Sequence, residues 1–218
     1  KKEKEGGISV EKYAAIGKVN LKFNLPAPLL LSAALLILSP LFIGIQNLDP
    51  LECAKVLEYY LVFLGVILFP PVFLPEQNRE IRDLTDSKYT GAWVVYGIRV
   101  LESLAALMVL LAVYMAVMKK GNCQFEFFRL YGGTLATMAF LGGMGIIVYA
   151  LTDQVVIGYM IPILYYILCI SAGSGKLGVF YLFSMSQGEF GGKAVLGAAG
   201  ILMTAVGIWV RSENVKIM

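Results

Sequence analysis

Residues 131–151, YGGTLATMAFLGGMGIIVYAL, contain no charged side chain and decide the class of fold. A helix needs ~20 apolar residues to cross the ~30 Å hydrocarbon layer of a bilayer, and this run has that length. The whole chain of 218 residues is 58% hydrophobic and 15% charged, and its mean hydropathy is +0.75. Such a composition excludes a disordered chain and a large soluble domain. The sequence therefore predicts an integral membrane protein.

Five further apolar runs share this character and are separated by short polar links. In lipid every backbone amide needs an internal partner, so each run is predicted to be a helix. We therefore expect an all-α integral membrane protein with a single transmembrane domain over residues 1–218. Its six predicted spans are residues 26–46, 51–73, 92–118, 131–151, 155–170 and 194–210.

Local signals define the limits of several spans. Asp49 suits a helix N-cap, Pro50 suits the first helical position and Glu52 can complete a capping box, so the second span starts here. The pair Pro70–Pro71 lacks amide donors and is expected to disturb the last turn of that span. Residues 177–183 are apolar but too short to cross, which predicts a re-entrant or outer hairpin between spans five and six.

The distribution of basic residues predicts the orientation. Residues 1–25 hold six lysines and scattered apolar positions, which predicts a cytosolic amphipathic segment on the membrane surface. Six spans place both termini on one side. If that side is the cytosol, the inner segments carry eleven Lys and Arg residues and the outer segments carry six. The positive-inside rule then favours a multi-pass protein of the cell membrane with both termini cytosolic.

Several chemistries lack the residues they need. The chain has no histidine, which excludes histidine-dependent triads and HExxH metal sites. Its cysteines, Cys53, Cys123 and Cys169, show no CxxC spacing. Cys53 and Cys123 both fall at outer ends of spans, so the sequence leaves open whether they form a disulfide. The string Gly173–Lys176 lacks the first glycine and the final Ser or Thr of a phosphate loop, so we expect neither an enzyme nor a cofactor in this chain.

Ionisable residues inside the spans are candidates for a translocation pathway. They are Glu58 in span two and Arg99 and Glu102 in span three. Arg99 and Glu102 are three residues apart and could pair or line a cavity. The alternative for Arg99 is that it extends to the cytosolic headgroups, and the alternative for Glu58 is a structural hydrogen-bonding role.

Span six carries small residues on one helical face. They are Gly197, Gly200, Thr204 and Gly207, at spacings of three and four. Such a face lets two helix backbones approach closely. It fits packing against another span of the same chain or a seam between two copies.

The segment LPEQNREIRDLTDSKYT, residues 74–90, breaks the apolar pattern with many charges. Ile81 and Leu84 form a narrow apolar ridge on a predicted short cytosolic helix. The oppositely charged i,i+4 pairs on this helix are Arg79 with Asp83 and Arg82 with Asp86. We expect the ridge to dock in a partner's groove, and the alternative is a solvated loop that its charge pairs merely stabilise.

This layout resembles the permease subunits of type-2 ATP-binding-cassette transporters. The shared features are the amphipathic amino-terminal segment, the charged segment between spans two and three, the overlong span 92–118 and the broken apolar stretch before the last span. The local echo is Glu80-Ile81-Arg82-Asp83-Leu84 with Ser87-Lys88. The resemblance implies that the charged segment is the coupling helix, which sits in a groove of a separate ATPase subunit. The implied coupling residues are Glu76, Arg79, Glu80, Ile81, Arg82, Asp83, Leu84 and Asp86.

The resemblance also implies partners. The working unit would hold two permeases, as a homodimer or a heterodimer, and two ATPase subunits that bind ATP and Mg. The chain would contact membrane lipid but no nucleic acid, and would export a peptide or an amphiphilic substrate.

Two other classes stay open. A substrate-capture subunit of the energy-coupling-factor type has a similar size, but the A-x-x-x-A face typical of its first span is missing from residues 26–46. The other class is an immunity or scaffold membrane protein without a transport cycle. Co-purification with an ATPase would discriminate among the three.

Overall fold

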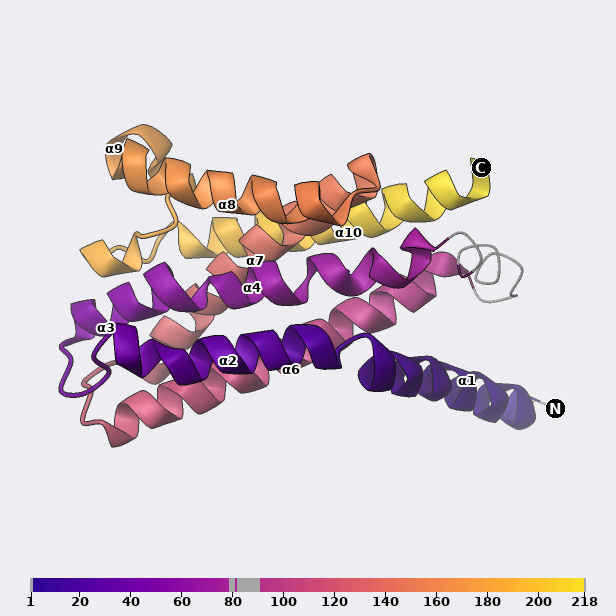
Figure 1. The fold of residues 1–218 in the computed structure, drawn as a ribbon, viewed down its shortest axis with the longest axis horizontal. Coiled ribbons are helices and arrows are strands. Elements are labelled where there is room, and N and C mark those ends of the chain that lie inside the picture. The colour runs from indigo at the N-terminus through magenta and orange to yellow at the C-terminus, as the bar shows by residue number, and fades with distance from the viewer. Residues whose placement is uncertain (1, 79–80, 82–90, 218) are drawn as a thin grey trace.

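The computed structural model describes residues 2–78, 81 and 91–217. Within these ranges every regular element is a helix, which confirms the all-α prediction for this part of the chain. Figure 1 shows the long helices running along the long axis of the molecule. The first and last helices both reach the same end of the bundle, which we call the terminal end. The opposite end, where α9 lies, is called the loop end.

Five helical stretches in the described part of the chain are long and apolar enough to cross a membrane. They are Pro50–Gln77, Ala92–Lys120, Phe127–Thr152, Val155–Ala172 and Lys193–Glu213. A sixth arises if the bent pair Tyr13–Phe23 and Pro26–Phe42 counts as one span. The chain therefore has the helices of a membrane protein, with five or six candidate spans.

The first predicted span is shorter than expected. Helix α1 (Lys2–Phe23) is followed by α2 (Pro26–Phe42), and their axes differ by 54°. The 17 residues of α2 extend over ~26 Å, slightly less than a bilayer core. The predicted end at residue 46 is wrong, because the helix ends at Phe42. The chain then pairs with the connection between α6 (Ala92–Lys120) and the next long helix, where the Asn47 N–H donates to the Gly121 carbonyl at 2.8 Å.

The second span is a composite of four helical pieces. They are α3 (Pro50–Val56), the π-helical turn η1 (Leu57–Leu61), α4 (Phe63–Leu68) and the 3₁₀-helix η2 (Pro70–Gln77). As predicted, the span opens with a capping box, in which the Glu52 carboxylate accepts the Asp49 N–H at 3.4 Å. The prolines Pro70–Pro71 begin the 3₁₀ stretch, so the expected disturbance of the last turn is confirmed.

Four longer helices complete the bundle. They are α6 (Ala92–Lys120), α7 (Phe127–Thr152), α8 (Val155–Ala172) and α10 (Lys193–Ile217). The 29 residues of α6 extend over ~43 Å, so this helix exceeds the membrane core as predicted. Helix α10 continues seven residues past its predicted end at residue 210. The extra turns carry polar residues that were expected to form a tail.

The connection between α8 and α10 is folded but is not a simple hairpin. Its short pieces are α9 (Ser174–Leu177), η3 (Gly178–Phe180) and η4 (Met185–Gln187). Tyr181, Leu182 and Phe183 are buried against the helices, so protein covers the backbone here, as expected for an apolar stretch too short to cross.

Helix α7 and the composite second span form the centre of the bundle. Their most apolar windows are 61% and 78% buried, against 22–33% for α6, α8 and α10. The small-residue face of α10 packs on α7. A Cβ on Gly200 would lie 2.5 Å from backbone atoms of Ala139 and Phe140. The described structure therefore uses this face for packing within the chain, as the first of the two alternatives proposed.

Candidate functional site: two buried ion-pair clusters

The loop-end cluster consists of Glu58, Lys193, Thr137 and the backbone of residues 182–186. Glu58 lies in η1 and is fully buried, and Lys193 is the first residue of α10 and almost as deeply buried. Lys193 Nζ lies 2.6 Å from Glu58 Oε1. The π-turn widens the helix at Glu58, a feature that often marks a special site.

Every charged group in the loop-end cluster is hydrogen-bonded. The two Glu58 oxygens accept the N–H groups of Met185 at 2.9 Å and Ser186 at 2.8 Å. Lys193 Nζ donates to Thr137 Oγ1 at 2.9 Å and to the Leu182 carbonyl. With Glu58, these partners use all three donors of the ammonium group. The cluster therefore fastens the α8–α10 connection to the bundle, which favours the structural role of Glu58.

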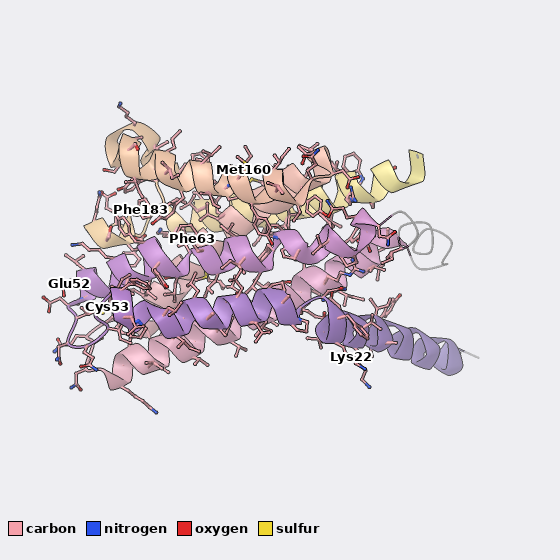
Figure 2. All side chains as sticks on the ribbon, in the orientation of Figure 1. Lys22, Glu52, Cys53, Phe63, Met160 and Phe183 are labelled. Atoms are coloured by element: carbon pink, nitrogen blue, oxygen red, sulfur yellow. The ribbon has the colours of Figure 1, made fainter. Side chains whose placement is uncertain are left out.

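Aromatic rings enclose this cluster. Phe183 stacks on Tyr59 with centroids 4.2 Å apart and meets Tyr166 edge-on at 5.2 Å. Tyr166 also contacts Phe63 at 4.6 Å, and Figure 2 shows Phe63 and Phe183 in this half of the molecule. Burial raises the pKa of Tyr181, and Tyr59 and Glu58 nearby raise it further. These rings give the Glu58–Lys193 pair apolar surroundings, in which a charge without a partner would be costly.

The terminal-end cluster consists of Glu76, Arg99, Asp153 and Arg211. Glu76 is fully buried, and Arg99 Nη1 donates to its two oxygens at 2.8 and 2.9 Å. The same nitrogen donates to the Val72 carbonyl at 3.0 Å. Arg99 is therefore buried against Glu76, which contradicts its alternative placement at the headgroups. Glu76 lies in the protein interior, although it belongs to the charged segment 74–90. The reason is that η2 places the Glu76 carboxylate against α6. There the buried carboxylate and the Arg99 guanidinium neutralise each other.

The second pair of this cluster joins α7 to α10. Arg211 Nη1 lies 2.6 Å from Asp153 Oδ1, and the guanidinium lies 5.9 Å from the ring centroids of Phe73 and Tyr149. Arg211 is buried, whereas Asp153 is half-exposed. Arg99 Nε and Arg211 Nε are buried without an acceptor in the described part of the chain, while the Arg211 guanidinium also interacts with the Tyr96 hydroxyl. The four formal charges balance, but these guanidinium donors are not saturated.

Sequence reasoning did not select Lys193 and Arg211 as site residues. A signal was present, because positions 193, 197, 200, 204, 207 and 211 continue the spacings of three and four that define the glycine face. A helix that turns this face to α7 necessarily directs both cations inward. Arg211 was expected in the tail after span six, but α10 continues through it; the side of the membrane on which it lies stays a prediction.

The three predicted pathway residues do not form one site. Glu102 accepts a hydrogen bond from Asn20 Nδ2 at 2.6 Å, which ties α1 to α6. Arg99 has Glu76 as its partner, and Glu58 belongs to the loop-end cluster.

Most of the predicted coupling residues lie outside the described residues. They are Arg79, Glu80, Arg82, Asp83, Leu84 and Asp86. Ile81 is described and is 41% exposed, and the coupling role of all of them stays a prediction. Within the described ranges there is no group of three or more His, Cys, Asp or Glu side chains that could hold a metal ion.

The functional proposal for this chain rests on the geometry of its described residues. A scan against protein-family models found no match, and searches of curated proteins and of solved structures found no similar protein. The observations define an α-helical protein whose helices are suited to a membrane and whose described residues include a buried ion-pair cluster at each end of the bundle.

Proposed function

We propose that this chain is the membrane-spanning permease subunit of an ATP-driven transporter of the type-2 ATP-binding-cassette class. It works with a second permease and with separate ATPase subunits that bind ATP and Mg. The terminal end faces the cytosol, and the substrate is an exported peptide or amphiphile. The order of elements supports this proposal: a bent amino-terminal helix pair, a charged segment between the second span and the overlong α6, and a folded connection before α10.

The observation that carries the proposal is the ion pair between Glu76 and Arg99. Glu76 lies at the end of the second span, where the charged segment 74–90 begins, and Arg99 lies in the helix that follows this segment. Their 2.8 Å contact is buried, so separating the two helices at this point would leave a buried charge without its partner. A partner that displaces residues 79–90 would move both helices together, as the coupling of an ATPase to a permease requires.

The first test is whether an ATPase binds through the apolar ridge. The tagged chain is purified in mild detergent from its native membranes, and we expect an ATPase to co-purify and hydrolyse Mg-ATP. Replacing both Ile81 and Leu84 by aspartate should reduce the recovered ATPase at least tenfold, because two charges would have to enter an apolar groove.

The matched control is Thr85→Asp with Ser87→Asp, which adds the same two charges at polar positions of the same segment. This control should retain the ATPase. Equal ATPase recovery with Ile81→Asp/Leu84→Asp and with the control would contradict the coupling role, and recovery of no ATPase with the unaltered chain would end the proposed function.

The orientation has a separate test. Single cysteines at positions 85 and 122 of a cysteine-free chain should react with a membrane-impermeant maleimide from opposite sides. We expect position 122 to react from outside intact cells and position 85 only after permeabilisation. The reverse pattern would overturn the cytosolic placement of the terminal end.

A further inference from the structure

Two cysteines meet at the loop end, in the contact between two chain connections. Cys53 lies in α3 and is completely buried, and Cys123 follows α6 and is 6% exposed. The Leu48 carbonyl accepts both the Cys53 thiol at 3.6 Å and the Gln124 N–H at 3.2 Å. Because one carbonyl oxygen contacts Cys53 and the residue after Cys123, the two cysteines are neighbours.

Other contacts hold this arrangement in register. The Cys123 thiol donates to the Ile45 carbonyl at 3.2 Å, and the Asn47 N–H donates to the Gly121 carbonyl at 2.8 Å. The thiols of Cys53 and Cys123 also interact with each other directly. Figure 2 places Cys53 beside Glu52 at the loop end, far from Lys22.

The third cysteine provides an internal reference. Cys169 lies within α8, where its surroundings are Tyr165, Leu182 and Lys193. Cys53 and Cys169 belong to two different groups of buried side chains. Cys169 should therefore stay a free thiol whatever happens to the pair.

We propose that Cys53 and Cys123 form a structural disulfide in the mature protein. The proposal rests on the orientation given above, in which the loop end faces the outside, because disulfides persist in oxidising compartments. The bond would join the start of the second span to the connection between α6 and α7.

The oxidant is the disulfide of a thiol–disulfide exchange catalyst on the outer side of the membrane. The Cys123 thiolate attacks that disulfide, and one catalyst sulfur leaves as a thiolate. The Cys53 thiolate then attacks the Cys123 sulfur of the mixed disulfide and releases the second catalyst sulfur. Two electrons pass to the catalyst, and the two cysteines lose two protons. Since Cys53 is inaccessible in the finished fold, the exchange takes place while the outer connections are folding.

The test counts free thiols in the full-length chain, expressed in a bacterial inner membrane with an oxidising periplasm. Cells are quenched with acid, and the protein is dissolved in detergent at denaturing concentration and treated with N-ethylmaleimide. Intact mass spectrometry should find one adduct before reduction and three after it, out of the three cysteines. Cys53→Ser and Cys123→Ser should each show two adducts without reduction, and Cys169→Ser should show none.

Three adducts without reduction would overturn the proposal. The chain is then synthesised into lipid vesicles in a buffer that contains oxidised glutathione, so that its connections fold in the presence of an oxidant, to show which premise failed. If the bond forms under these conditions, the orientation is wrong; if the thiols still remain free, the geometry is wrong. Neither result depends on an ATPase, so this test can fail independently of the coupling experiment.

Discussion

The two ends of the bundle differ in how completely their buried charged groups are hydrogen-bonded. At the loop end the Glu58 carboxylate and the Lys193 ammonium find every partner they need, including two backbone N–H groups and a threonine hydroxyl. At the terminal end Arg99 and Arg211 each have an acid, yet some of their buried N–H groups find no acceptor in the described part of the chain. One end is a closed hydrogen-bond network and the other is a balanced but incomplete one.

This difference suggests different mechanical roles. A fully satisfied network has one favourable arrangement, since any shift breaks several charged hydrogen bonds at once. An incomplete network of two acids and two guanidinium groups can exchange partners at lower cost. We therefore expect the loop end to keep a single conformation. The terminal end, beside the proposed ATPase contact, can rearrange.

The largest effect should come from breaking the loop-end pair. Lys193→Met leaves the buried Glu58 carboxylate without a cation and should lower the free energy of unfolding by about 3–5 kcal/mol. Thermal and denaturant unfolding in detergent would measure this loss. Lys176→Met, at an exposed lysine of the same connection, is the control and should change little. A Glu58→Gln/Lys193→Met double variant should recover part of the loss, because the uncompensated charge is gone.

A smaller effect is expected from the corresponding change at the terminal end. Arg99→Met removes the cation that contacts Glu76, but Arg211 also attracts this carboxylate and has unsaturated donors. The loss should be about 2–3 kcal/mol, at or below the lower limit for a broken buried pair. The control is Arg129→Met, whose ion pair is exposed and 3.7 Å long.

A further test measures the effect of Arg99→Met in a chain that already carries Arg211→Met. There Arg99→Met should cost more than in the unaltered chain, because the compensating cation is missing. If the Arg99→Met loss equals that of Lys193→Met and is the same in both backgrounds, the terminal end does not rearrange and the distinction between the ends is wrong.

The smallest effect should come from Asp153, the half-exposed acid of the terminal end. Asp153→Asn keeps an acceptor for Arg211 and should cost about 0.5–1 kcal/mol, as for a solvent-screened pair. Asp153 has a left-handed backbone with φ 53°, which asparagine tolerates and alanine does not. Asp153→Ala should therefore cost about 1 kcal/mol more. Equal stability of the two variants would show that the backbone at this turn relaxes freely.

Local features of the fold were predictable from sequence. The capping box at Asp49 and Glu52, the disturbed turn at Pro70–Pro71 and the excess length of α6 depend on neighbouring residues alone. The end of α2 was not predictable in this way. Residues 43–46 are apolar enough to continue a helix, but the Ile45 carbonyl accepts the Cys123 thiol. The next two residues, Asn47 and Leu48, pair with the connection after α6, which is distant in sequence.

For the candidate sites, the sequence predicted some of the residues but not their partners. Glu58, Arg99 and Glu102 were recognisable as site residues because charge is rare inside apolar runs, whereas Glu76 was selected only through the family resemblance. Their partners were not recognised. Arg99 was expected to pair with Glu102, line a cavity or reach the headgroups, and Glu76 was expected to contact an ATPase. A linear sequence does not show that η2 turns this acid toward the helix that carries the arginine.

By itself, the sequence determined that this chain forms helices long and apolar enough to cross a membrane, and where most of them lie. A bilayer imposes a length and a hydrogen-bonding requirement on each segment separately. Only the tertiary structure decided which charges meet. Glu58 and Lys193 are 135 positions apart, and their contact depends on how α3 to η2, α7 and α10 are rotated and shifted against one another. Close packing of the glycine face of α10 on α7 sets that rotation, and with it directs Lys193 to one end of the bundle and Arg211 to the other.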